Sequence, residues 1–213
     1  MKKILLVLLT MMVFFFLTQC GESDDPNTKY FKDGKEITKS QFKEADETGT
    51  IATFHLEGTK ESEAEYKNGK KNGKETTWTH TGKKVAETNY KDDQWFGRRT
   101  TYDNDGILKA ITDYKDRKKH GKWIHFFPDG KKEFEFDYKE GREHGKRITY
   151  FKDGKKKTDE IWQNGIENGL CTRWYENGQK SDEGHFENGK KTGDWTYWDK
   201  EGKIKSQINY DKK

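Results

Sequence analysis

The chain has 213 residues, of which 38% are charged and 29% are hydrophobic, and its mean hydropathy is −1.30. Leu, Ile, Val and Phe make up about one sixth of it, below the ~20% expected of a chain that folds around a large aliphatic core. Disorder is also disfavoured, because 42 Lys and Arg nearly balance 38 Asp and Glu, and 14% of the residues are aromatic. The composition therefore favours an ordered but thin fold.

The N-terminal segment has the pattern of an export signal. Lys2 and Lys3 precede an apolar run over residues 4–17, which is too short to predict a membrane-spanning helix. Cys20 and a polar stretch follow, an arrangement similar to a bacterial lipoprotein signal. Gln19 departs from that signal, because a small residue usually precedes the lipidated cysteine.

The resemblance implies a signal peptide over residues 1–19 and a lipid on Cys20, which would anchor the protein to a membrane of the cell envelope. Residues 20–29 would then form a flexible tether. An ordinary signal peptide or an uncleaved anchor is the alternative. Cys171 is the other cysteine of the chain, so we expect no intramolecular disulfide after lipidation.

Four series of residues recur every 24 positions in the rest of the chain. Glycine stands at 49, 73, 97, 121, 145, 169 and 193, and again at 34, 58, 82, 106, 130, 154, 178 and 202. One aromatic series contains Phe54, Trp78, Tyr102, Phe126, Tyr150, Trp174 and Trp198, and the other contains Phe42, Tyr66, Tyr90, Tyr114, Tyr138, Trp162, Phe186 and Tyr210. The chain therefore reads as seven 24-residue units over residues 42–210, after a half unit that begins near Tyr30. Residues 30–213 form the predicted repeat domain.

Each unit is expected to consist of a β-hairpin followed by a connection to the hairpin of the next unit. Asx-Gly pairs such as Asp129-Gly130 predict the hairpin turns, and segments such as residues 67–73 predict the longer connections. Two strands and two turns fill a unit and leave no room for a helix. Because the period is even, even-numbered residues should stay on one face of the sheet. That face would carry both aromatic series, and charged residues such as Glu63 and Glu135 would lie on the other face.

Two segments, residues 66–73 and 121–130, resemble MORN repeats, in particular the bacterial variant found in YwqK-type proteins. The resemblance covers residues 30–210 in a constant register. It implies an all-β fold: an elongated, single-layer antiparallel β-meander of stacked hairpins. About fifteen strands would fill this length.

No residue set predicts catalysis, a cofactor or a metal site. Equivalent positions in successive hairpins lie about 10 Å apart, so the acidic series that contains Glu63 and Glu135 forms a ladder and not a catalytic pair. His120 and His144 are too far apart for one zinc ion and are expected in exposed turns. Cys171 reads as a small, half-buried side chain. The chain is therefore not expected to be an enzyme.

The distribution of charge predicts a binding patch. Residues 114–157 carry 15 basic against 8 acidic residues, and acidic stretches flank them. The candidate patch consists of Trp123, Phe127, Lys131, Lys132, Arg142, Arg147 and Phe151. An unknown acidic protein or an anionic surface is the expected partner. Nucleic acid is disfavoured, because the pI of about 8.7 lacks a strong basic footprint and a lipoprotein lies outside the cytoplasm. The alternative is that dense charges merely keep an open sheet soluble.

Two functions are left open by these observations. The first is a non-enzymatic envelope lipoprotein that acts as a protein- or surface-binding repeat scaffold. The second follows from the resemblance, because YwqK-type proteins are commonly catalogued as antitoxins. It is an antitoxin or immunity protein that neutralises a toxin partner.

Overall fold

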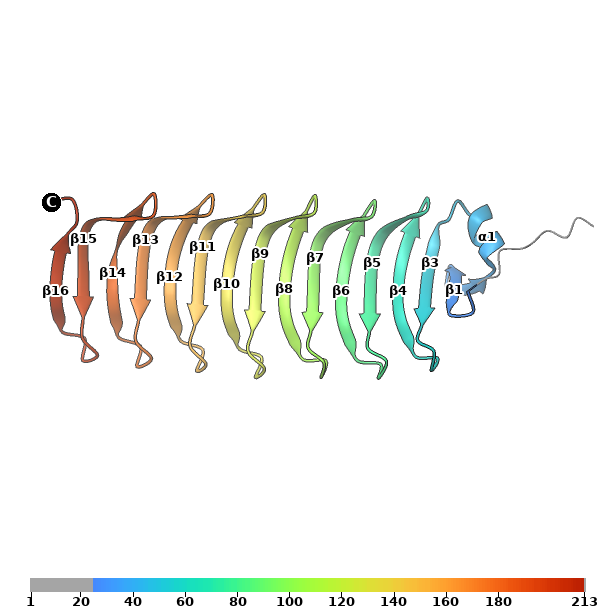
Figure 1. Cartoon of the computed structure of the whole chain (residues 1–213), viewed down its shortest axis with the longest axis horizontal. Coiled ribbons are helices and arrows are strands. Elements are labelled where there is room, and N and C mark those ends of the chain that lie inside the picture. The colour runs from blue at the N-terminus through green and yellow to red at the C-terminus, as the bar shows by residue number, and fades with distance from the viewer. Residues whose placement is uncertain (1–24, 213) are drawn as a thin grey trace, which may run out of the picture.

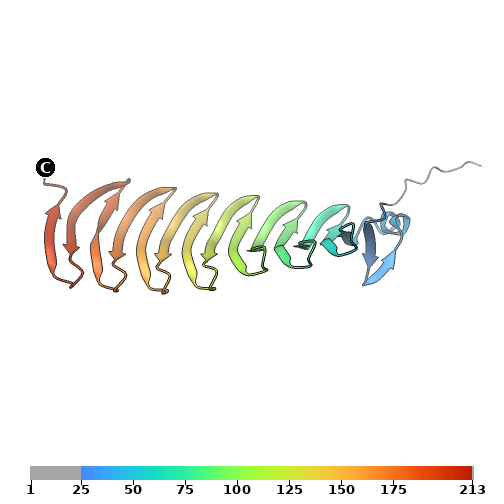
Figure 2. The ribbon, with the colours of Figure 1, turned by 60° about the horizontal axis from the view of Figure 1, so that its bottom comes forward.

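The computed structural model describes residues 25–212, which form one open antiparallel sheet of sixteen strands with one short helix (Figure 1). The strands are β1 Thr28–Lys32, β2 Lys35–Ile37, β3 Gly49–Phe54, β4 Lys60–Lys67, β5 Lys70–Trp78, β6 Lys84–Lys91, β7 Gln94–Tyr102, β8 Leu108–Lys115, β9 Lys118–Phe126, β10 Lys132–Lys139, β11 Arg142–Tyr150, β12 Lys156–Gln163, β13 Ile166–Trp174, β14 Lys180–Glu187, β15 Lys190–Trp198 and β16 Ile204–Asn209. The helix α1 spans Lys39–Glu44. Figure 2 shows from a second direction that the hairpins follow one another in a single layer. The expected all-β, elongated single-layer fold is confirmed.

From β3 to β16 the strands lie in chain order along the sheet, each paired with the strands before and after it. The order changes at the N-terminal end. There β1 pairs with both β2 and β3, so the β1–β2 hairpin forms that edge of the sheet. At the other edge, β16 pairs with β15 alone among the described strands.

The helix corrects the expectation that the repeat region has no room for one. Thr38 accepts a hydrogen bond from the Gln41 amide, and the Gln41 side chain accepts one from the Thr38 amide, which together make a capping box at the start of α1. Phe42 therefore lies on a helix and not on a strand. Its ring packs 5.2 Å from the ring of Tyr30 and 6.5 Å from that of Tyr66, so α1 covers the end of the sheet with the aromatic residue that the repeat supplies.

The long and short connections are exchanged relative to the expectation. Asn68 and Gly69 form a two-residue turn in which both have positive φ angles, 52° and 72°. The Asx-Gly pairs expected in tight turns lie instead in five-residue loops. In the loop over residues 127–131, the Phe127 amide donates to the Lys131 carbonyl at 2.8 Å.

The expectation that even-numbered residues share one face is wrong. A two-residue turn joins residues three apart, such as Lys67 and Lys70, so an even-numbered residue lies opposite an odd-numbered one. Ala64, for example, lies opposite Glu75. The side chains on one face are therefore even-numbered on one strand and odd-numbered on the next.

As a consequence, the two aromatic series lie on opposite faces. The Trp123 face is defined by Trp123 and its cross-strand neighbour Phe136, and it carries the series that contains Tyr138. The Glu135 face is defined by Glu135 and its cross-strand neighbour Ile124, and it carries the series that contains Phe126. Each face therefore has one row of rings, where the sequence predicted both rows on one face.

Candidate functional site

A groove of about 620 Å³ opens on the Trp123 face, where β9, β10 and β11 approach the long loops. It is lined by Trp123, Phe127, Glu133, Phe134, Phe136, Arg147, Thr149, Tyr150, Phe151, Lys152, Lys157 and Glu176. Four members of the predicted patch are brought together here: Trp123 and Arg147 from strands, and Phe127 and Phe151 from the first positions of two loops.

The other three residues of the predicted patch lie elsewhere. Lys131 is in the loop after β9, where its amino group lies 3.3 Å from a carboxylate oxygen of Asp129. Lys132 is on the Glu135 face and pairs with Glu135 at 2.5 Å. Arg142 is exposed at the start of β11, beside the short turn. Hence the seven residues do not form one surface.

Closely packed rings make up the floor of the groove. The ring centroid of Trp123 lies 4.6 Å from that of Phe134, 5.8 Å from that of Phe136 and 5.9 Å from that of Tyr138. The Lys119 amino group lies 3.2 Å from the Trp123 ring centroid, and burial there lowers the pKa of Lys119. Sequence reasoning missed Phe134 and Phe136, although aromatic residues at every second position of β10 indicate a shared face.

A second groove of about 520 Å³ adjoins the first. It is lined by Phe151, Lys157, Trp174, Tyr175, Glu176, Asn177 and Lys200. Phe151, Lys157 and Glu176 line both grooves, so the two form one continuous depression along the long-loop side of the Trp123 face.

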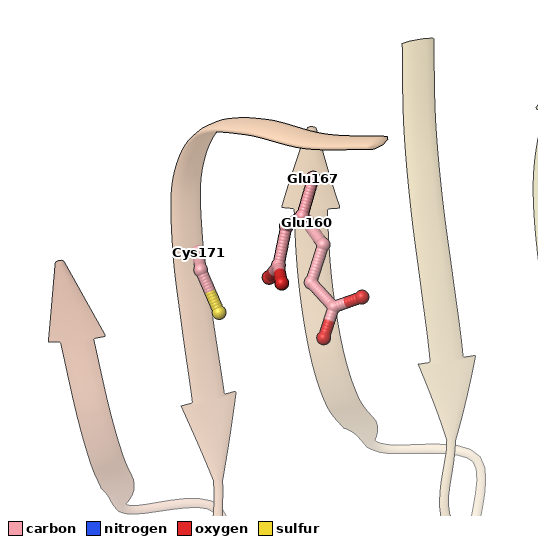
Figure 3. Close-up of side chains that lie close together, drawn as sticks. All are labelled: Glu160, Glu167 and Cys171. Carbon is pink, nitrogen blue, oxygen red and sulfur yellow. The ribbon is translucent and has the colours of Figure 1, made fainter. Parts of the chain in front are cut away.

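Glu160, Glu167 and Cys171 form a compact cluster on β12 and β13 (Figure 3), with their ligand atoms within 4.8 Å of one another. Two arginines already balance its charge. Arg147 donates to Glu160 at 2.8 Å, and Arg173 lies 3.5 Å from Glu160 and 3.6 Å from Glu167. The donor set is therefore occupied by guanidinium groups, which favours a structural ionic network over a metal site.

The thiol in this cluster is a poor nucleophile. Cys171 is fully buried, and burial raises the pKa of its thiol to about 12. Burial also raises the pKa of Glu167, with a further contribution from the nearby Glu160 carboxylate. At neutral pH the thiol is therefore protonated.

The acidic series on the Glu135 face is ion-paired and not simply solvated. Each carboxylate pairs with the lysine three positions before it. These pairs are Lys60–Glu63, Lys84–Glu87, Lys132–Glu135, Lys156–Asp159 and Lys180–Glu183. Leu108 and Ile111 replace the pair in the third unit. The ladder therefore stabilises the face without presenting a row of free carboxylates.

The histidines predicted in turns lie in strands instead. His120 and His144 are half-buried in β9 and β11. His125 contacts two residues that line the groove: its Nδ1 is 2.7 Å from a carboxylate oxygen of Glu133, and its ring stacks on Phe134 at 5.2 Å.

The predicted lipidation site, Cys20, lies outside the described residues, as does the apolar run before it. Among residues 25–212, no helix has the length and apolar character needed to cross a membrane.

The model of the MORN repeat variant family matches four segments: residues 71–92, 119–140, 167–188 and 191–212. The matches share one register, and each covers a hairpin closed by a five-residue loop, for example β5 and β6 in residues 71–92. The chain thus carries repeats of the MORN variant, in an array of hairpins with the same topology. No curated protein matches the chain.

Proposed function

We propose that this protein is a non-enzymatic binding scaffold of the bacterial cell envelope, tethered to a membrane by a lipid on Cys20. The observation that carries the proposal is the groove on the Trp123 face. The described residues form a single layer (Figure 2), so no second layer among them covers the rings, and a concave, ring-lined depression is the usual form of a recognition site. The MORN-variant repeats support the scaffold part of this function.

The tether is supported by the N-terminal sequence. A cysteine after a short apolar run with two preceding lysines has the arrangement of a lipoprotein signal. Acyl chains on Cys20 would hold the sheet at a membrane surface and leave the grooves free for a protein partner.

Metabolic labelling with a fatty acid tests the tether. We expect the wild-type chain to incorporate label and to fractionate with membranes, and the Cys20→Ser variant to lose both properties. Absence of label in the wild type would refute the lipid anchor.

A pull-down from envelope fractions tests the binding function. The bait is the full acylated chain, and its matched control carries Phe151→Ser and Trp123→Ser. A partner recovered by the wild type and lost with the control supports the scaffold function. Recovery of a toxin whose growth inhibition this protein relieves would support the narrower immunity function. Equal recovery by both baits would place binding outside the groove.

A further inference from the structure

An aromatic residue from each of three successive loops lines the joined grooves. Phe127, Phe151 and Tyr175 occupy the same position of three successive loops, and each lines one or both grooves. Equivalent residues in successive hairpins are two strands apart, which is about 9.6 Å in a sheet. The depression therefore presents an aromatic ring at regular intervals along the sheet axis, perpendicular to the strands.

Three lysines at this depression have no acidic partner. Among the described residues, no ion pair joins Lys152, Lys157 or Lys200 to a carboxylate, although all three line the grooves. Other lysines of these loops differ: Lys131 pairs with Asp129, and Lys155 pairs with Asp153 at 2.9 Å.

The acids of the depression do not neutralise these lysines. Glu133 is bound to His125, and Glu176 is the other carboxylate in the lining. The Lys157 amino group lies 5.8 Å from the ring centroid of Phe151, so positive charge and apolar surface are adjacent. An anionic occupant that also carries apolar side chains fits this combination.

We propose that the depression binds an extended acidic segment of a partner protein, with an apolar side chain at every third residue. A polyproline II segment rises ~3.1 Å per residue, so its residues i and i+3 are about 9.3 Å apart on one side. That spacing matches the ~9.6 Å between rings of successive hairpins. A β-strand is a poorer match, because its side chains on one side repeat at about 6.7 Å. The inference rests on the proposed binding function and specifies the partner's chemistry.

A labelled synthetic peptide of four Leu-Glu-Pro triplets is the probe, and fluorescence polarisation with the full chain in a neutral detergent is the measurement. The control peptide has the same composition with the leucines placed consecutively. We expect the triplet peptide to bind at least about tenfold more tightly than the control, a difference of ~1.4 kcal/mol. Equal affinity for both peptides would overturn the proposed spacing.

The variant Lys152→Glu/Lys157→Glu/Lys200→Glu tests the charges. Its matched control is Lys67→Glu/Lys70→Glu/Lys190→Glu, which changes charge equally at exposed lysines beside the short turns. Only the first variant should lose affinity, by about tenfold or more for three charge contacts. Equal losses in both variants would mean non-specific attraction and would overturn the proposal.

Cross-linking keeps the test independent of how the variants fold. A benzophenone on the central leucine of the triplet peptide should label residues of the joined grooves in the wild-type chain. Labelling confined to other residues would overturn the proposal even if the pull-down identifies a partner.

A membrane occupant is tested in vesicles of brominated phosphatidylglycerol, with the wild-type chain reconstituted. Quenching of tryptophan fluorescence that disappears in the Lys152→Glu/Lys157→Glu/Lys200→Glu variant would assign the depression to lipid headgroups and overturn the peptide proposal. Equal quenching in both chains is the expected result.

Discussion

The indole of Trp195 fills the space that a side chain at position 184 would occupy. A β-carbon built on Gly184 would lie 2.3 Å from the ring, and Trp195 is completely buried in a sheet of one layer. Corresponding positions of other units hold Ala64, Thr88, Thr112, Phe136 and Glu160. The absence of a side chain at Gly184 on β14 therefore makes room for the large indole of Trp195 on the adjacent strand β15.

This pair makes a first prediction. Gly184→Ala should lower the free energy of unfolding by about 1–3 kcal/mol, because the added methyl overpacks against the indole. In a Trp195→Leu background, Gly184→Ala should lower the free energy of unfolding by less, because leucine is smaller than tryptophan and leaves room for the added methyl group. Thermal and urea unfolding of the four chains measure this coupling, and additive effects would contradict it.

The two-residue turns make a second prediction. Arg117 has a φ of 63°, whereas the corresponding position is a glycine in four other turns, such as Gly141, and Asp93 in a fifth. Because the left-handed region costs a non-glycine residue ~1–2 kcal/mol, Arg117→Gly should raise the unfolding temperature. Gly141→Arg is the reciprocal variant and should lower it. A stabilising effect of Gly141→Arg would argue against backbone strain as the cause.

The buried ionic network makes a third prediction. Glu160→Ala should destabilise the protein by about 1–3 kcal/mol, because Arg147 loses a buried hydrogen-bond acceptor, while Arg147 keeps Glu143 and Arg173 keeps Glu167 and Asp182. Glu36→Ala is the control. It removes an exposed pair with Lys29 and should cost ~0–1 kcal/mol. Chemical denaturation measures both, and similar costs would mean that burial adds little to the network.

The ion-paired ladder makes a prediction about pH. Hydrogen bonds from Lys74 and Lys84, with a third from Tyr102, lower the pKa of Glu87 from its ordinary 4.5 to about 2. A lowered folded-state pKa contributes stability that is present above pH 4.5 and lost as the pH falls towards 2. Glu87→Gln should therefore be less stable at neutral pH and lose less stability between pH 5 and 2.

Thermal unfolding across that pH range checks this prediction, with Glu57→Gln at an exposed loop position as the control for charge removal. If Glu87→Gln leaves the dependence of stability on pH unchanged, another carboxylate is responsible for the loss of stability at low pH.

The repeat makes a prediction about deletions. Removal of residues 91–114 deletes a whole unit and joins Tyr90 to the equivalent turn at Lys115, so the shortened sheet should keep its β-structure. Removal of residues 91–102 deletes β7 and its turn and should unfold part of the sheet. Circular dichroism and limited proteolysis compare the two. Equal damage would be inconsistent with stacked, independent units.

The 24-residue spacing and the Asx-Gly pairs were sufficient to predict repeated hairpins, and the resemblance to MORN repeats implied the single layer. The spacing was not sufficient to assign faces, because a two-residue turn places an even-numbered residue opposite an odd-numbered one. Asn68-Gly69 and Asp129-Gly130 carry the same type of turn signal, and only the backbone distinguishes the tight turn from the loop.

The same error divided the candidate patch. Trp123 and Arg147 line the groove, whereas Lys132 lies on the opposite face because the register of β10 shifts between Lys132 and Phe134. The helix α1 could have been predicted from the capping-box pattern of Thr38 and Gln41. Phe42 fits the 24-residue aromatic series on a strand as well as on a helix, so that series alone does not indicate α1.

The helix that covers one end of the sheet gives the stack a direction of growth. A unit joined after β16 would find a strand ready to pair, whereas a unit inserted before β3 would displace the contacts of Phe42 with Tyr30 and Tyr66. Gene duplication of whole units is therefore expected to lengthen such proteins on the β16 side and to leave the covered end unchanged.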